Sequence, residues 1–162
     1  MASPIRWMAP AVLALLALAS CTTAEPKATA APAPVVVTIN GPAAPANAPG
    51  QSLYLVRYEI APGTPLRPHH HEGTQIGLVA AGELTYHVLT GDVPVYRAGT
   101  DGKLVLDRTL TAGSVGTVQA GEWLVEEPED HHWGANQGTV PLVIYTSSLL
   151  REGAPLATPD PP

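Results

Sequence analysis

Residues 65–77 read PLRPHHHEGTQIG, a run of three histidines between a proline and a glycine. Side chains alternate between the two faces of a β-strand. His69 and His71 are therefore expected on one face and His70 on the other. The next strand is expected to begin at Gln75, which brings its side chain across the sheet toward the first two rings. The pattern predicts imidazoles that converge inside a fold rather than a histidine tract on the surface.

A second histidine cluster lies further along the chain, where residues 130–136 read DHHWGAN. By the same alternation, His131 and His132 face opposite ways, and Trp133 points away from the side that His132 faces. We expect His70 and His131 to lie at the surface or to orient a ligand. The lone His87 is expected to have a structural role.

The chain between these segments has the pattern of an all-β domain. Short β-rich runs are separated by Gly, Pro, Asn or Asp, and no long apolar stripe of helical period is present. Many short strands of this kind favour a sandwich or closed barrel. Phenylalanine is absent, so the core must come from Val, Leu, Ile, Tyr and Trp. The expected strands are 52–60, 75–82, 83–90, 104–110, 114–121, 122–127 and 140–150.

The histidine-rich stretch resembles the first motif of the cupins. That motif has Gly, five residues, His, one residue, His, three or four residues, Glu, six residues and Gly. The chain keeps every spacing, with Gln in place of Glu, at Gly63, His69, His71, Gln75 and Gly82. The second motif is more degenerate: Pro128, His132 and Asn136 are present, but Asp130 replaces a Gly and the gap from Pro to His is one residue short.

The resemblance implies a cupin double-stranded β-helix, or jelly-roll barrel. It also implies one divalent transition metal (Fe, Zn, Ni, Mn or Cu) at the barrel mouth, held by His69, His71, Gln75 and His132. Neutral imidazoles suit such ions. Asn136 would have a structural role in the second motif. Cupins of this size often form dimers, so a homodimer is expected. A metal-free ligand pocket is the alternative.

Gln75 is the departure from the motif that matters most for the chemistry. Its amide brings an oxygen but no charge, so three histidines and Gln75 leave the charge of the ion uncompensated. Such a site would bind hard metals less well and attract anionic ligands to its open positions. Alternatively a nearby acid, Glu72, Glu122 or Glu126, replaces the missing Glu. Gln75 is preferred here, because it holds the motif position and has the right parity.

Two functions remain open from the sequence. The first is a small metalloenzyme, dioxygenase- or isomerase-like, that acts on a small organic molecule. The second is a non-catalytic cupin receptor for a small ligand or a metal. This fold supports many activities, and the residues name no general acid or base. The net charge of −6 and the lack of a basic block exclude nucleic acid as an expected partner.

The first residues resemble a bacterial lipoprotein signal. Arg6 precedes an apolar run that is too short to span a bilayer. The run ends in Leu18-Ala19-Ser20-Cys21, a lipobox-like sequence, and Thr22 follows, which favours the outer membrane. The expected product is an outer-membrane lipoprotein, lipidated on Cys21, that faces the periplasm. Because Cys21 is the single cysteine, no disulfide is expected.

The expected organisation follows from these segments. A signal peptide covers 1–20, and a lipidated Cys with a Pro/Ala-rich linker covers 21–50. The cupin domain covers 51–150, and a flexible tail covers 151–162. Within the linker, residues 35–39 (VVVTI) could add an edge strand to the domain.

Overall fold

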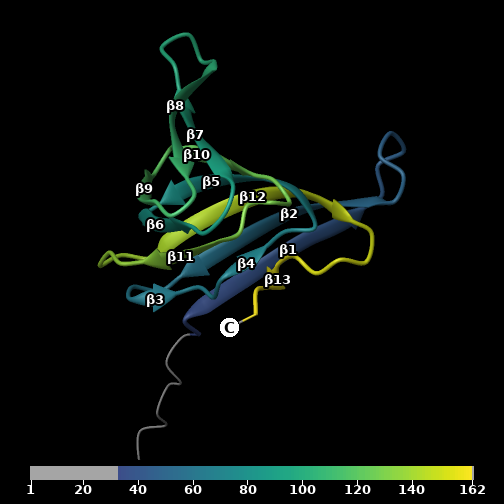
Figure 1. Ribbon diagram of the computed structural model, residues 1–162, viewed down its shortest axis with the longest axis horizontal. Coiled ribbons are helices and arrows are strands. Elements are labelled where there is room, and N and C mark those ends of the chain that lie inside the picture. The colour runs from purple at the N-terminus through teal and green to yellow at the C-terminus, as the bar shows by residue number, and fades with distance from the viewer. Residues whose placement is uncertain (1–32, 162) are drawn as a thin grey trace, which may run out of the picture. The chain divides into compact units, whose positions relative to one another are not determined.

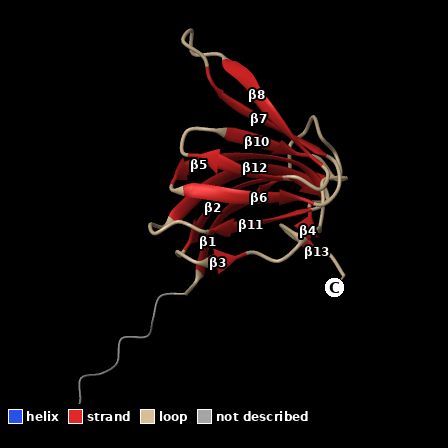
Figure 2. Cartoon of the chain, turned by 60° about the vertical axis from the view of Figure 1, so that its left-hand side comes forward, coloured by secondary structure: helices blue, strands red, loops and turns tan. Residues whose placement is uncertain are grey.

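The computed structural model describes residues 33–161 of the chain, and every regular element in that range is a β-strand (Figure 2). The expected signal peptide and Cys21 lie outside the described residues. Within the described residues, no helix is long and apolar enough to cross a membrane.

Two antiparallel sheets make up the fold (Figure 1). The first sheet has the order β1-β2-β12-β5-β10-β7-β8. Its strands are β1 (Val35–Ala43), β2 (Gln51–Ile60), β12 (Leu142–Arg151), β5 (Gly73–Ala81), β10 (Trp123–Glu126), β7 (Asp92–Ala98) and β8 (Leu104–Thr111).

The second sheet has the order β13-β4-β11-β6-β9, with β3 also paired to β11. Its strands are β13 (Thr158–Pro159), β4 (His69–His70), β11 (His132–Asn136), β6 (Glu83–Val88), β9 (Val115–Gln119) and β3 (Thr64–Pro65). The all-β prediction is confirmed, and the two sheets are consistent with the jelly roll that the resemblance implies.

The apolar core lies between the sheets and follows the period of two along each strand. In β6, for example, Leu84, Tyr86 and Val88 are buried and alternate with less buried residues. Valine, leucine, isoleucine and tyrosine supply the core, as expected for a chain without phenylalanine. Trp133 is instead half-buried and stacks on His87, with the ring centroids 3.6 Å apart.

All seven expected strands are present, within a few residues of their expected ends. Residues 35–39 do form an added edge strand, β1, which pairs with β2. Strand β7 is not among the expected strands. Its short β-rich run is interrupted by Pro94, and proline cannot donate to a sheet ladder.

The carboxyl-terminal segment differs from the flexible tail expected over 151–162. Strand β13 pairs with β4, opposite His69 and His70. The amide of Asp160 donates to the Pro68 carbonyl at 3.0 Å. The composition of this segment predicts a loose chain, but backbone hydrogen bonds to a distant strand hold it against the domain.

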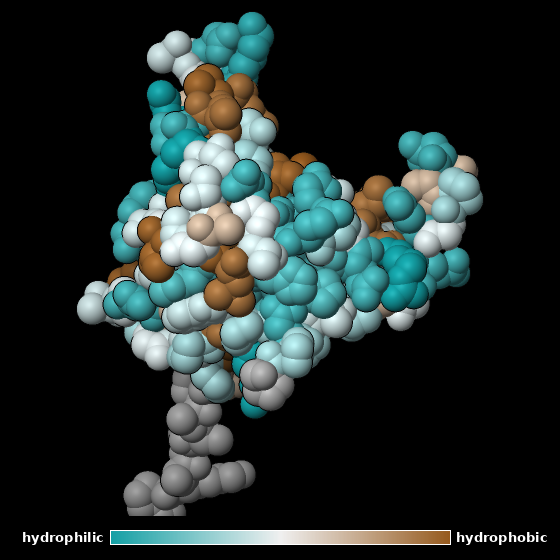
Figure 3. All heavy atoms as spheres, in the orientation of Figure 1, coloured by the Kyte–Doolittle hydropathy of each residue, from teal (hydrophilic) through white to brown (hydrophobic). Residues whose placement is uncertain are grey.

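The hairpin of β7 and β8 extends beyond the rest of the domain (Figure 1). Apolar side chains gather on it (Figure 3), and Leu104, Val105 and Leu106 of β8 are exposed. The core-facing side chains of this hairpin, Val93, Val95 and Leu110, lie at its other end and are buried.

Gly82, the last residue of the motif, makes the tight connection between β5 and β6. Its φ of +76° is in the left-handed region that favours glycine. An added Cβ would also lie 2.8 Å from the Pro141 carbonyl oxygen and 2.9 Å from the Cα of Leu142. Both the conformation and the close approach to the start of β12 therefore require glycine here.

We predict that Gly82→Ala destabilises the protein more than Gly121→Ala does. Both glycines have positive φ, but a Cβ on Gly121 would meet nothing within 4 Å. The conformational cost is shared, and the steric clash at Gly82 adds about 1–3 kcal/mol. Denaturant unfolding of both variants measures the difference. Equal losses of stability would show that β12 moves aside freely.

Candidate metal centre

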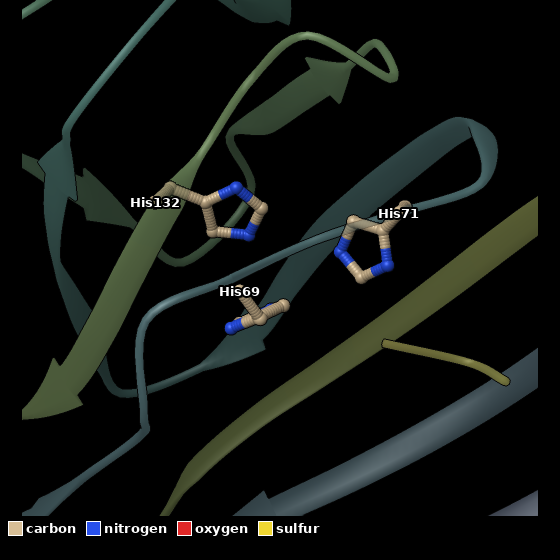
Figure 4. Close-up of side chains that lie close together, drawn as sticks. All are labelled: His69, His71 and His132. Atoms are coloured by element: carbon tan, nitrogen blue, oxygen red, sulfur yellow. The ribbon is translucent and has the colours of Figure 1, made fainter. Parts of the chain in front are cut away.

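Three imidazole rings, two from the first histidine run and one from the second, lie close together (Figure 4). His69 lies in β4, His71 directly follows that strand, and His132 begins β11. One nitrogen from each ring lies within 4.8 Å of the others. The ring centroids of His69 and His132 are 4.4 Å apart. The predicted convergence of these three side chains is confirmed.

Strand register explains why these three rings meet. His132 pairs with His69 across β11 and β4, so the two side chains lie on the same face. Alternation then directs His70 and His131 to the other face, where their rings form a separate pair 4.5 Å apart. The structure confirms the predicted face of the strand for each of these side chains.

Each of the three rings is fixed in the same way through its Nδ1 atom. A backbone carbonyl can only accept, so each Nδ1 must carry the proton that it donates. The neutral ring then has its lone pair on Nε2, as a metal-ligating histidine needs. The three contacts are His69 Nδ1 to Arg67 O at 2.7 Å, His71 Nδ1 to Leu156 O at 2.6 Å and His132 Nδ1 to Asp130 O at 2.9 Å.

Asp130, which replaces the glycine of the second motif, shapes the turn before His132. Its carboxylate accepts hydrogen bonds from the backbone amides of Glu127, at 2.7 Å, and Asp92, at 3.2 Å. The Asp130 backbone carbonyl accepts the hydrogen bond from His132 Nδ1. The departure from the motif therefore supplies a side chain that ties two loops together and leaves the ring orientation intact.

A buried carboxylate, Glu126, lies beside the histidines. One oxygen is 3.3 Å from His71 Nε2 and the other is 3.2 Å from His132 Nε2. Tyr86 donates its hydroxyl to Glu126 at 2.8 Å and stacks its ring on His132. Glu126 is only 3% exposed, so its charge has no solvent to balance it and depends on these neighbours.

Burial and neighbouring charges together lower the pKa values of His69 and Glu126 and raise the pKa of His71. Burial lowers the pKa of His69 to about 4, and the neighbouring His132 adds to that shift. Burial, the largest single cause, lowers the pKa of His71, but the charge of Glu126, its contact with the protonated ring and the Leu156 carbonyl together outweigh burial, and the net pKa is raised. Burial raises the pKa of Glu126, yet His132, His71 and Tyr86 outweigh it, and the net pKa is lowered. The centre thus holds one carboxylate that favours a neighbouring cation.

Gln75 is brought to the cluster, but its amide oxygen faces away from the histidines. It lies in a row across three strands, opposite Ser148 on one side and Glu126 on the other. The atom 2.6 Å from the Glu126 carboxylate must be the amide nitrogen, because a carboxylate only accepts. The amide oxygen accepts from the Ser148 hydroxyl at 2.5 Å. Ligation of a metal by Gln75 stays a prediction.

Of the three acids considered as replacements for the missing Glu, only Glu126 lies in the centre. Glu72 pairs with Arg151 at 3.2 Å, and Glu122 pairs with Arg108 at 2.7 Å. Nothing in the sequence favoured Glu126 over the other two acids, and no pattern singled out Tyr86 or Ser148 for the site. The cross-strand pairing of residue 75 with residue 126 would have identified Glu126, but that pairing depends on the order of strands in the sheet.

A cavity of about 270 Å³ adjoins the three histidines and Glu126. Most of its walls are apolar, with Ile60, Leu66, Val79, Leu84, Leu124 and Ile144 among them. Arg67 is exposed and is the one basic residue besides histidine among the described lining residues. Ala157 and Pro159 of the carboxyl-terminal segment line the cavity as well. The site therefore has room for a small, largely apolar molecule next to the imidazoles.

Comparison with solved structures finds similar β domains. An oxalate oxidase in complex with the substrate analogue glycolate is 26% identical over 74% of this chain and 52% of its own, with a TM-score of 0.46. A cupin 2 domain-containing protein from Halorhodospira halophila is 15% identical over 83% of this chain and 76% of its own, with a TM-score of 0.49. An oxalate decarboxylase from Lactobacillus farciminis is 17% identical over 66% of this chain, with a TM-score of 0.43.

The chain spans about half the length of the oxalate oxidase and 26% of the oxalate decarboxylase. No protein-family model matches the sequence. No curated protein matches it either. The chemistry of the centre follows from its own residues, which are three histidines with their Nδ1 atoms held by backbone carbonyls, beside a buried carboxylate and an apolar cavity.

Proposed function

We propose that the chain is a metal-binding cupin in which His69, His71 and His132 hold one divalent transition metal. The observation that carries this proposal is the hydrogen bond from each Nδ1 to a backbone carbonyl, which leaves the Nε2 lone pairs of three neighbouring rings for a metal ion. Neutral imidazoles directed in this way are typical of zinc, iron, nickel and copper sites.

In this proposal Glu126 supplies the carboxylate that Gln75 lacks. Glu126 reaches the Nε2 atoms of His71 and His132 from the strand next to β5. Gln75 then acts as a positioning residue, with its amide held between Ser148 and Glu126. The negative charge of Glu126 offsets part of the charge of the ion. The site is therefore expected to attract anionic ligands less strongly than a site made of three histidines and Gln75 alone.

The activity that this geometry supports best is that of a small metalloenzyme acting on a small organic carboxylate. His69, His71 and His132 would hold the divalent ion, which would supply a Lewis acid for a substrate oxygen. The apolar walls of the cavity bind the body of the molecule and exclude water. Arg67, at the exposed part of the lining, is suited to a carboxylate on the substrate.

A non-catalytic receptor for a small ligand is the second candidate. Glu126 is the one carboxylate among the described lining residues, and His71, His132, Tyr86 and Gln75 already surround it. A group held in this way is poorly free to accept a proton from a substrate. This observation favours binding without turnover.

The proposal includes an anchor. The lipobox-like residues before Cys21 and the Pro/Ala-rich segment after it support an outer-membrane lipoprotein whose domain faces the periplasm. Several acyl chains on one residue give a stable anchor, whereas a single chain gives marginal binding.

We predict that His132→Ala removes one bound metal ion per chain, because it deletes one of the three converging nitrogens. Glu126→Gln keeps the shape of the side chain but removes its charge, and it should weaken the affinity of that site about 10–100-fold. Calorimetric titration of the chelator-treated protein with Zn²⁺ measures both effects.

Two matched controls accompany these variants. His87→Ala removes a histidine that stacks on Trp133 outside the centre. Glu127→Gln removes the charge of an exposed neighbour of Glu126. Both should bind metal like the parent protein. Unchanged binding in Glu126→Gln with loss in Gln75→Ala would instead assign the fourth ligand to Gln75.

The enzyme and the receptor give different results with a panel of small carboxylic acids, phenols and diketones. For the enzyme, we expect product formation or oxygen uptake that needs the metal and falls at least tenfold in His132→Ala. The readouts are mass spectrometry and an oxygen electrode. Thermal stabilisation by a ligand without product would identify the receptor and contradict the enzyme.

The anchor is tested by metabolic labelling in a bacterial host. The parent chain should incorporate labelled palmitate and fractionate with outer membranes, whereas Cys21→Ser should do neither, because it lacks the thiol that carries the lipid. Equal labelling of the two proteins would exclude lipidation at Cys21.

A further inference from the structure

A second cluster of ligand-type side chains lies on the opposite face of β4 and β11. It consists of His70, His131 and Asp160, and we call it the outer triad. The Nδ1 atom of His70 lies 2.9 Å from Asp160 Oδ1, and the Nδ1 atom of His131 lies 2.8 Å from the same oxygen. One carboxylate oxygen therefore has two imidazole nitrogens directed at it.

The outer triad is assembled by the same strand pairing as the inner histidines. Because His69 pairs with His132, their sequence neighbours His70 and His131 lie side by side on the other face, with ring centroids 4.5 Å apart. The third member comes from the far end of the chain. Strand β13 pairs with β4 and carries Asp160 to the two rings.

The spacing of the outer triad suits a metal ion with little movement. Bonds of about 2.1 Å from one ion to a nitrogen and an oxygen place those two atoms about 3.0–3.4 Å apart at angles between octahedral and tetrahedral. The observed separations are 2.8 and 2.9 Å. An ion bound here takes the place of the Nδ1 protons, and each ring then carries its proton on Nε2.

The outer triad is also accessible in a way that the inner centre is not. The side chains of His70 and His131 are 24% and 38% exposed. A surface depression lined by Thr90, Glu129, His131 and Asp160 adjoins it. An ion can therefore reach it from solvent and complete its coordination with water. Two histidines and one carboxylate, in an open site, are a donor set for zinc, nickel or copper.

We propose that His70, His131 and Asp160 form a second divalent-metal site, which fastens the carboxyl-terminal segment to the barrel. The segment 154–160 supplies the Leu156 carbonyl that orients His71, and Ala157 and Pro159 line the cavity. An ion on the outer triad therefore holds one wall of the inner site in place. The proposal does not require the inner site to bind metal.

The test is Zn²⁺ titration of the full-length, chelator-treated protein by calorimetry. The parent protein should bind two ions per chain, and Asp160→Asn should bind one. The Asn side chain keeps an oxygen that accepts hydrogen bonds, so it separates loss of the charged ligand from loss of the contact. Glu129→Gln, which changes a neighbouring carboxylate in the same depression, should still bind two.

A second measurement tests whether the ion holds the carboxyl-terminal segment against the domain. It uses a His132→Ala background, in which the inner site lacks one of its ligands. Zn²⁺ should slow hydrogen exchange of the Asp160 amide, which donates to the Pro68 carbonyl, at least tenfold. The double variant with Asp160→Asn should show no such slowing. Nuclear magnetic resonance reads this amide directly.

The outcomes separate the two sites. A parent protein that binds one ion, lost in His132→Ala and kept in Asp160→Asn, would overturn the outer site and leave the inner one intact. One ion lost in Asp160→Asn and kept in His132→Ala would support the outer site and contradict the inner one. Two ions in both the parent and Asp160→Asn would also overturn the outer site.

Discussion

The register between β4 and β11 is the constraint on which both histidine clusters depend. Because His69 lies opposite His132, the side chains of His69, His71 and His132 gather on one face of the sheet, and His70 and His131 lie on the other. A slip of one residue would turn every side chain of the strand to the other face. Asp130 supports the register, because its carboxylate joins the turn before β11 to the amide of Asp92.

The buried charge of Glu126 explains the remaining polar side chains of the interior. A lone carboxylate inside an apolar barrel is unfavourable unless hydrogen bonds and a cation surround it. Tyr86 and Gln75 donate to it, and His71 and His132 lie beside it. These contacts give a polar region in an otherwise apolar cavity, and a small molecule can contact both kinds of wall.

Only the resemblance to the cupins implied that His132 joins His69 and His71. Alternation and spacing were sufficient to predict that His69 and His71 share a face, because those rules act within a strand. They also predicted the all-β fold and the added strand at residues 35–39. They could not place Glu126 beside residue 75, or Asp160 beside His70, because these contacts span 51 and 90 residues and depend on the order of strands. The proline-rich composition of the last residues predicted a loose tail, since it contains no sign of the β13 pairing with β4.

The direct pairing of residue 75 with residue 126 has a consequence for how such domains evolve. The two side chains meet at hydrogen-bonding distance, so an acid at both positions would place two like charges together, and an acid at neither would leave the interior without one. Sequences related to this chain should therefore exchange glutamate between the two positions together. A sequence motif that requires glutamate at the position of residue 75 would miss relatives that carry it at the position of residue 126, on the adjacent strand.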